Sequence, residues 1–328
     1  MMKYKTFLQI KSKYMKEFVP GTGHGHGHVH KHVYKSCITE SKDQYVLVLQ
    51  RIEKQQQPND VDSLDDTLEY LPQCGKIHSD QTFEKNGQTF DYPTWTITNE
   101  SRFAIRDPMH AKFRGTAFLV LAIINKQTGE CVDSIIAISI CNIHTLYQVG
   151  RIIVPNLYDC QIDQVCAPGI HFFNDFETAY FYQLDPISTK YTGPIKRYYD
   201  DGAIQMIGQY KDGTLNGPTM CIDRGLISKG NRSDGVKTGR WIETCQYINM
   251  ISIKQYDANG NLQERALVRK SDSDHNELTQ MVKNTNPGSE EWDKLIQMIQ
   301  NAKSIRDQDE SLGPKFSPNL SPSVRKKY

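Results

Sequence analysis

Turn signals recur at a regular interval in the second half of the chain, and this interval restricts the possible folds more than any other feature. Gly202, Gly213, Gly225 and Gly235 lie ten to twelve residues apart. The first two follow an aspartate, and Asp-Gly suits the type I′ turn, whose two central residues both need positive φ. One strand fits between successive turns, so the region after Gly193 is predicted to form consecutive antiparallel hairpins. A single hairpin buries too little surface to be stable alone, and we therefore expect the hairpins to stack.

Aromatic residues accompany these turns and carry a resemblance to a known repeat family. The stretches YYDDG around Gly202, GQYKDGTLNG from Gly208 to Gly217, and GRW ending at Trp241 resemble MORN-type repeats. They are most similar to the degenerate variant of bacterial antitoxin-like proteins and giant DNA viruses. The resemblance covers about residues 196–268 and departs from the standard repeat at 228–236 and 248–253. It implies a hairpin repeat over 191–270 with a binding or scaffolding role, and the candidate binding residues are Tyr199, Tyr210, Trp241 and Tyr256.

The first 190 residues are predicted to form a mixed α+β domain, which makes the whole chain α+β. The stretch YVLVLQRI from Tyr45 alternates as a strand does, and the polar stretch 53–66 after it predicts a linker or exposed loop. Two apolar runs, AFLVLAIIN and CVDSIIAISI, flank a turn at Gly129 and predict a central hairpin covered on both faces. A short helix is expected after Asn174 as N-cap, with Glu177 completing a capping box.

A second resemblance lies inside this first domain. Tyr147-Gln148-Val149-Gly150 is followed by Val154-Pro155 and then by a Cys-x-x-Gly-Ile-His motif within Cys166–Phe173. This order is similar to a domain of unknown function in giant-virus and phage proteins, over roughly residues 110–184. The resemblance brings no activity with it. Together the two resemblances imply a viral protein located in the host cell cytoplasm or in the virion.

His171 is the residue of this motif for which a site can be considered. It lies between a predicted turn and the start of a helix, where a polar side chain can face a ligand. The structural alternative, which we favour, is that backbone groups satisfy its ring nitrogens. A zinc site is a further alternative, because Cys141, His144, Cys160 and Cys166 supply four ligands of suitable type.

Five histidines stand at every second position of the segment 21–32. They are His24, His26, His28, His30 and His32. In an extended chain, side chains two residues apart point the same way, so the imidazoles form one row that can chelate zinc or another divalent transition metal. The alternating glycines before His28 disfavour a regular strand, and an exposed polar loop without a metal is the alternative interpretation.

The region 271–308 is predicted to provide a helical cap. In SEEWDKLIQMIQNAKSI, Ser289 is a suitable N-cap, and Trp292, Leu295, Ile296 and Ile299 form one helical face. We expect this face to cover the open end of the repeats, with a partner-binding helix as the alternative. The tail 309–328 is rich in Ser and Pro and is expected to be disordered.

Composition narrows the classes of function. The 328 residues carry 39 basic and 38 acidic side chains, a balance without the basic stripe of a nucleic-acid-binding protein. No apolar run is long enough to insert into a membrane, and no secretory signal begins the chain, so we expect a protein that is not secreted. A non-enzymatic scaffolding or protein–protein interaction protein with a protein partner is the favoured interpretation. The alternatives are an enzyme or small-ligand domain centred on Cys166–Phe173, and a metal-binding protein.

Overall fold

The computed structural model describes residues 4–18, 31–53, 82–85, 88–91, 95–139, 143–155, 158–159, 161–245, 247, 249–269 and 272–304. The fold is mixed α+β, as predicted. Contacts divide the chain into two compact units, residues 1–224 with 232–236 and residues 225–231 with 237–328. The sequence places a domain boundary near residue 190, whereas the division by contacts falls within the repeat region. Most of the histidine-rich segment, most of the 53–66 linker and the 309–328 tail lie outside the described residues.

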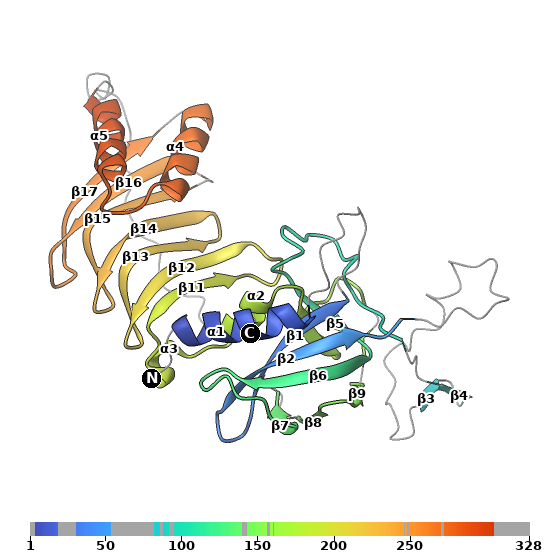
Figure 1. The fold of residues 1–328 in the computed structure, drawn as a ribbon. Coiled ribbons are helices and arrows are strands. Elements are labelled where there is room, and N and C mark those ends of the chain that lie inside the picture. The colour runs from blue at the N-terminus through green and yellow to red at the C-terminus, as the bar shows by residue number, and fades with distance from the viewer. Residues whose placement is uncertain are drawn as a thin grey trace. The chain divides into compact units, whose positions relative to one another are not determined.

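The first unit contains a half-barrel sheet of six antiparallel strands in the order β5–β10–β1–β2–β6–β9 (Figure 1). Strand β1 pairs with β2 over its whole length, from His32 opposite Gln50 to Ile38 opposite Gln44. The strands are β1 (His32–Ile38), β2 (Gln44–Arg51), β5 (Lys112–Gly115), β6 (Phe118–Asn125), β9 (Ile152–Ile153) and β10 (Ile170–Phe173).

Both faces of this sheet are covered, as the continuous apolar runs predict. Because successive side chains of a strand point to opposite faces, Val46 and Val48 enter one core and Leu47 and Leu49 enter the other. The first core also contains residues of helices α1 (Tyr4–Phe18) and α2 (Phe176–Phe181). The second contains side chains of strands β7 (Ser134–Ile138) and β8 (His144–Gln148).

The predicted hairpin around Gly129 is only partly correct. Gly129 donates its N–H to the carbonyl of Asn125, which closes the turn, and Ile124 forms a single bridge with Cys131. Beyond this bridge the second apolar run leaves the six-stranded sheet. It becomes β7, which pairs with β8 in a separate two-stranded sheet. Strands β3 (Thr82–Lys85) and β4 (Gln88–Asp91) form another two-stranded pair.

The helices of the first unit show one correction. Asp175, and not Asn174, is the N-cap of α2, and its Oδ2 accepts hydrogen bonds from the N–H and hydroxyl of Thr178. Helix α1 was not predicted, yet its Phe7, Ile10 and Tyr14 are buried at helical spacing. Helix α3 (Pro186–Thr189) is a single turn.

The repeat region forms a seven-stranded antiparallel sheet whose strands follow one another in chain order, which is consistent with a hairpin repeat. Three of its turns, Asp212-Gly213, Arg224-Gly225 and Asp234-Gly235, have positive φ at both central residues, as a type I′ turn requires. At Asp201-Gly202 the type I′ prediction is wrong, because only the glycine has positive φ. The strands are β11 (Gly193–Tyr198), β12 (Ile204–Lys211), β13 (Thr214–Asp223), β14 (Leu226–Ser233), β15 (Val236–Cys245), β16 (Met250–Tyr256) and β17 (Leu262–Arg269).

The second unit contains helices α4 (Asp272–Asn284) and α5 (Glu290–Ser304). Ser289 caps α5 as predicted, since its Oγ accepts the N–H of Trp292 at 3.2 Å. The predicted apolar face of α5 is buried with Ile242, Ile251 and Ile253 of strands β15 and β16. Among the described residues, no helix is long and apolar enough to cross a bilayer.

Candidate functional site

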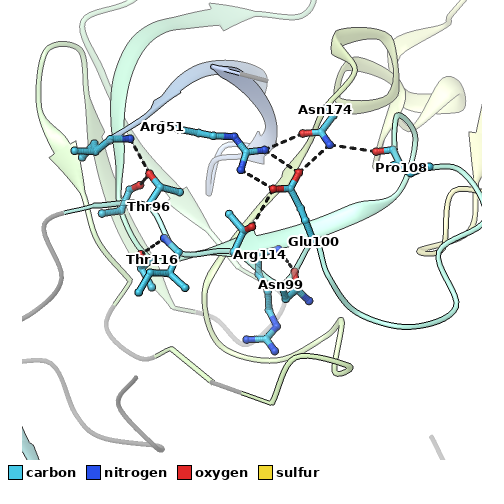
Figure 2. Close-up of polar contacts among 12 residues, drawn as sticks. Arg51, Thr96, Asn99, Glu100, Pro108, Arg114, Thr116 and Asn174 are labelled. Carbon is cyan, nitrogen blue, oxygen red and sulfur yellow. Dashed lines mark hydrogen bonds and ion pairs between the residues drawn. The ribbon is translucent and has the colours of Figure 1, made fainter. Parts of the chain in front are cut away.

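Three polar side chains from separate segments meet in a buried network beside the six-stranded sheet (Figure 2). The Nη1 and Nη2 atoms of Arg51 donate to the carboxylate oxygens of Glu100 at 2.6 and 2.8 Å, and Nη2 also reaches Asn174 at 3.1 Å. Asn174 in turn donates to Glu100 and to the carbonyl of Pro108. Burial raises the pKa of Glu100, but the hydrogen bonds from Arg51 and Asn174 outweigh it and hold the pKa below its ordinary value. The bidentate pair therefore ties β2 to the segment that contains Glu100, and Asn174 extends the network to the start of α2.

A second buried arginine holds one long loop in place. Arg114 of β5 is completely buried, and within the described part of the chain its guanidinium donates to backbone carbonyl oxygens and lies against the ring of Tyr158. Its backbone N–H donates to Oδ1 of Asn99 at 2.9 Å (Figure 2). Arg114 thus fixes the loop that carries Cys166. The acceptors are the carbonyls of Asp159, Gln161, Gln164 and Pro168.

His171 packs as a structural residue in β10. Its Nε2 lies 3.0 Å from the carbonyl oxygen of Val165, so this nitrogen carries the hydrogen and donates it. Burial lowers the pKa of His171 to about 4, and the charges of Lys35 and Lys112 act in the same direction. The ring therefore stays neutral at physiological pH. These contacts support the structural interpretation of His171 over a role as a catalytic base.

Four groups that can ionise converge next to this loop. The Nζ of Lys112 lies 3.1 Å from Oδ1 of Asp200, 3.3 Å from the hydroxyl of Tyr182 and 3.3 Å from the Sγ of Cys166. Burial disfavours the charge of Lys112, but Tyr182 and Asp200 outweigh it and raise the lysine pKa above its ordinary value. The lysine side chain is 7% exposed, whereas Cys166 is exposed to solvent. The arrangement places a buried ammonium group next to a carboxylate and a thiol that are more exposed to solvent.

A cavity of about 170 Å³ opens beside this cluster, between α2 and strands β11 and β12. Tyr182 and Asp200 belong both to the cluster and to the cavity wall. The sequence offered no spacing signal for this site, because its residues come from segments that only the fold brings together. The lining residues are Phe173, Thr178, Phe181, Tyr182, Gln183, Lys196, Arg197, Tyr198, Tyr199, Asp200 and Gln205.

The four candidate aromatic residues of the repeats differ in exposure. Trp241 is fully buried and donates from Nε1 to the carbonyl of Asn231, and Tyr210 is 8% exposed in the first core. Tyr199 is half-buried and donates its hydroxyl to the carbonyl of Ile222 at 2.6 Å. Tyr256 is also half-buried, with the Nζ of Lys237 5.5 Å from its ring centre. Packing thus occupies Trp241 and Tyr210, and Tyr199 alone of the four borders the cavity.

The structure describes only part of the residues considered for metal binding. His32 begins β1, whereas His24, His26, His28 and His30 lie outside the described residues, as do Cys141 and Cys160. His144 begins β8, and Cys166 lies beside Lys112. Within the part of the chain that the structure describes, no three His, Cys, Asp or Glu side chains come together as a metal site. Metal binding by the histidine row stays a prediction.

The outward face of the β7–β8 hairpin is apolar and exposed. Ile136 and Leu146 stand directly opposite each other across the two strands and are 57% and 58% exposed. The next outward pairs are Ser134 with Gln148 and Ile138 with His144. The inward residues of the same strands, among them Ile135, Ala137 and Tyr147, are buried in the second core. The outward face therefore has an apolar centre between the pairs Ser134–Gln148 and Ile138–His144, and none of these side chains is a Lys, Arg, Asp or Glu.

Comparison with known proteins identifies one domain in this region. The model of a family of unknown function (DUF5758) matches residues 96–179, so the chain contains a DUF5758 domain there. The predicted domain of unknown function at roughly 110–184 is confirmed to that extent. The match includes Glu100, Arg114, His171 and Asn174. No curated protein and no solved structure has a significant match to the chain.

Proposed function

We propose that this chain is a non-enzymatic interaction protein that binds a protein partner through the outward face of its β7–β8 hairpin. The observation that carries the proposal is the exposed pair of Ile136 and Leu146. A cross-strand pair of large aliphatic side chains on an exposed face forms a contiguous apolar patch, which loses contact with water when a partner covers it.

The charge of this face favours a protein over other macromolecules. The outward side chains of both strands are Ser134, Ile136 and Ile138 on β7, and His144, Leu146 and Gln148 on β8. None of these six is a lysine or an arginine, whereas binding to nucleic acid or to an anionic membrane relies on such residues. An apolar centre with a polar rim is the usual composition of a protein–protein interface.

The polar residues of the DUF5758 domain support a role without catalysis. Arg114 is engaged by backbone carbonyls, His171 by the carbonyl of Val165, and Glu100 by Arg51 and Asn174. The Nε2 of His171 donates into the protein, and burial with the nearby lysine charges lowers the pKa of the ring, which makes it a weak base. These contacts stabilise the sheet and its loops, from which the β7–β8 hairpin projects.

The wider biological role rests on the two sequence resemblances. The seven-stranded sheet is consistent with a hairpin repeat. The resemblance to degenerate MORN-type repeats and the resemblance to a domain of giant-virus and phage proteins both come from the sequence. On this basis the chain is proposed to be a scaffolding protein of a large DNA virus, acting in the host cytoplasm or in the virion.

The test places a photo-cross-linking amino acid at Gln148, on the rim of the apolar face, in the full-length chain within infected cells. We expect a cross-link to a defined partner protein, and we expect the double variant Ile136→Ser/Leu146→Ser to abolish it. The control is Ile187→Ser, because Ile187 is 76% exposed on α3 and away from the hairpin. Unchanged cross-linking by the double variant, or cross-links only to a second copy of the chain, would overturn the proposal.

A further inference from the structure

Arg197, which lines the cavity between α2 and β11, has one buried hydrogen-bond donor that the described part of the protein does not use. Arg197 donates from Nη2 to the carbonyl of Leu184 at 3.1 Å. Its Nε is buried, and among the described residues no acceptor lies within hydrogen-bonding distance of it. A buried donor without a partner costs roughly 1–3 kcal/mol, which makes such groups rare and favours a ligand that supplies the acceptor.

The charges around the cavity favour an anion. Arg197 and Lys196 line it, and the one acidic lining residue, Asp200, is already paired with the ammonium of Lys112. Tyr182 accepts a hydrogen bond from the same ammonium, so its hydroxyl hydrogen remains able to donate to a ligand. The cavity wall therefore contains a guanidinium and a phenol hydroxyl, with the exposed Lys196 at its rim and the carboxylate of Asp200 paired with Lys112.

The remaining wall of the cavity is aromatic. This composition indicates which group the ligand carries besides its anionic group. Phe173, Phe181, Tyr182 and Tyr198 all line the cavity. Aromatic side chains prefer flat partners in offset or edge-to-face contact. The volume of about 170 Å³ is below the roughly 300 Å³ at which sites for drug-sized ligands begin, so the ligand is small.

We propose that this cavity binds a small aromatic carboxylate, with the carboxylate on Arg197 and the ring among the aromatic side chains. Guanidinium and carboxylate match in geometry, because two parallel N–H groups meet two oxygens. An inorganic anion would leave the aromatic wall uncovered, and an uncharged aromatic molecule would leave the Arg197 Nε without its acceptor. The proposal is independent of the β7–β8 interface and can fail without affecting it.

The experiment is isothermal titration calorimetry of the full-length chain with benzoate, phenylacetate and 4-hydroxyphenylacetate, with benzamide as the uncharged analogue of benzoate. We expect at least one carboxylate to bind and benzamide to bind at least about tenfold more weakly, because it lacks the charge. Arg197→Met keeps the apolar stem and removes the guanidinium, and it should weaken carboxylate binding about 10- to 100-fold. Tyr182→Phe should weaken binding by a smaller factor.

Arg265→Met is the matched control, because Arg265 is exposed on β17 and is not among the lining residues. It should bind as the wild type does. If circular dichroism shows that Arg197→Met is unfolded, Lys196→Gln at the exposed rim takes its place, with a weakening of several-fold. The proposal is overturned if none of the three carboxylates binds, if benzamide binds as tightly as benzoate, or if the folded cavity variants keep the wild-type affinity.

Discussion

The Nζ atom of Lys126 lies 2.6 Å from the Oγ of Ser36, inside a core where the lysine is only 1% exposed. The same Nζ lies 3.1 Å from the carbonyl oxygen of Tyr182 and 3.3 Å from that of Ala179. Within the described residues, no carboxylate contacts this ammonium. Burial lowers the pKa of Lys126 to about 7, so the folded protein holds a lysine that loses its proton near neutral pH.

This lysine makes stability depend on pH above neutrality. Its folded-state pKa of about 7 is below the ordinary value of about 10.4, so the unfolded chain binds more protons between these pH values. The free energy of unfolding should therefore rise between pH 7 and 9, with a slope of at most about 1.4 kcal/mol per pH unit from this group. Urea unfolding should show the slope in the wild type and a shallower slope in Lys126→Met, in which Lys229, whose pKa burial lowers to about 8, still contributes. Lys196→Met, at an exposed position, should keep the slope.

His171 should make the protein sensitive to acid. Its pKa of about 4 lies below the ordinary 6.5, so protons favour the unfolded state as the pH falls through this range. Stability is retained above pH 6.5 and lost progressively towards pH 4, by up to about 3 kcal/mol. His171→Ala should remove this dependence, and at pH 7.5 it should lower stability by about 1–3 kcal/mol, because Val165 loses its donor. The control is His144→Ala, because His144 is an exposed histidine. Its thermal unfolding should match that of the wild type at pH 7.5 and near pH 4.

The hydrogen bonds from Arg114 to the loop that carries Cys166 should not survive a change of Arg114 to lysine. A lysine keeps the charge but cannot reach four carbonyl oxygens in the fork geometry of a guanidinium. Arg114→Lys should cost about 3 kcal/mol or more, because buried carbonyls lose their donors. Limited proteolysis should then cleave between residues 159 and 168. The matched change Arg106→Lys affects an ion pair with Asp201 in which the arginine is 76% exposed, and it should cost less than about 1 kcal/mol. Equal losses of stability in the two variants would contradict the role of Arg114 in holding this loop.

Two glycines with similar backbone angles should respond differently to alanine. Gly202 has φ of +85° and Gly150 has φ of +77°, so both substitutions strain the backbone by about 1–2 kcal/mol. At Gly202 a Cβ atom would also clash with the backbone carbonyl of Asp107, whereas at Gly150 nothing lies within 4 Å. Gly202→Ala should therefore lower the melting temperature considerably more than Gly150→Ala. Similar melting temperatures for the two variants would contradict the contact at Asp107.

The histidine row should bind zinc or nickel in a pH-dependent way. Imidazole takes up a proton below about pH 6.5 and then cannot bind a metal. We expect binding at pH 7.5 that disappears by pH 5. The triple change of His28, His30 and His32 to alanine should remove most of it in isothermal titration. Equal binding by the wild type and the triple variant would place the metal elsewhere, with Cys141, His144, Cys160 and Cys166 as the next candidates.

Local patterns in the sequence predicted the repeat sheet, the strand from Tyr45 and the apolar face of α5. These elements bury residues at regular intervals, so apolar residues recur at the same intervals in the sequence. These patterns gave wrong predictions where a contact between distant segments determines which of two residues caps a helix or which strand a segment pairs with. Asp175 caps α2 because Asn174 is bound by Arg51 and Glu100 from distant segments. The sequence predicts that the second apolar run of the Gly129 hairpin, which contains Ile138, pairs with β6. In the structure this run pairs with β8. The cavity at Arg197 has no sequence signature, since its residues share neither spacing nor motif.

The chain-order pairing of the seven-stranded sheet has a consequence for how it assembles. Each strand from β12 to β17 pairs with the strand that precedes it in the chain. All of these contacts are local in sequence, which lowers the entropic cost of closing each loop and favours rapid folding. The sheet can therefore lengthen one strand at a time as the ribosome delivers the chain. By the same logic, duplication or deletion of a whole hairpin leaves the other pairings unchanged, which gives evolution a simple way to adjust the length of the sheet.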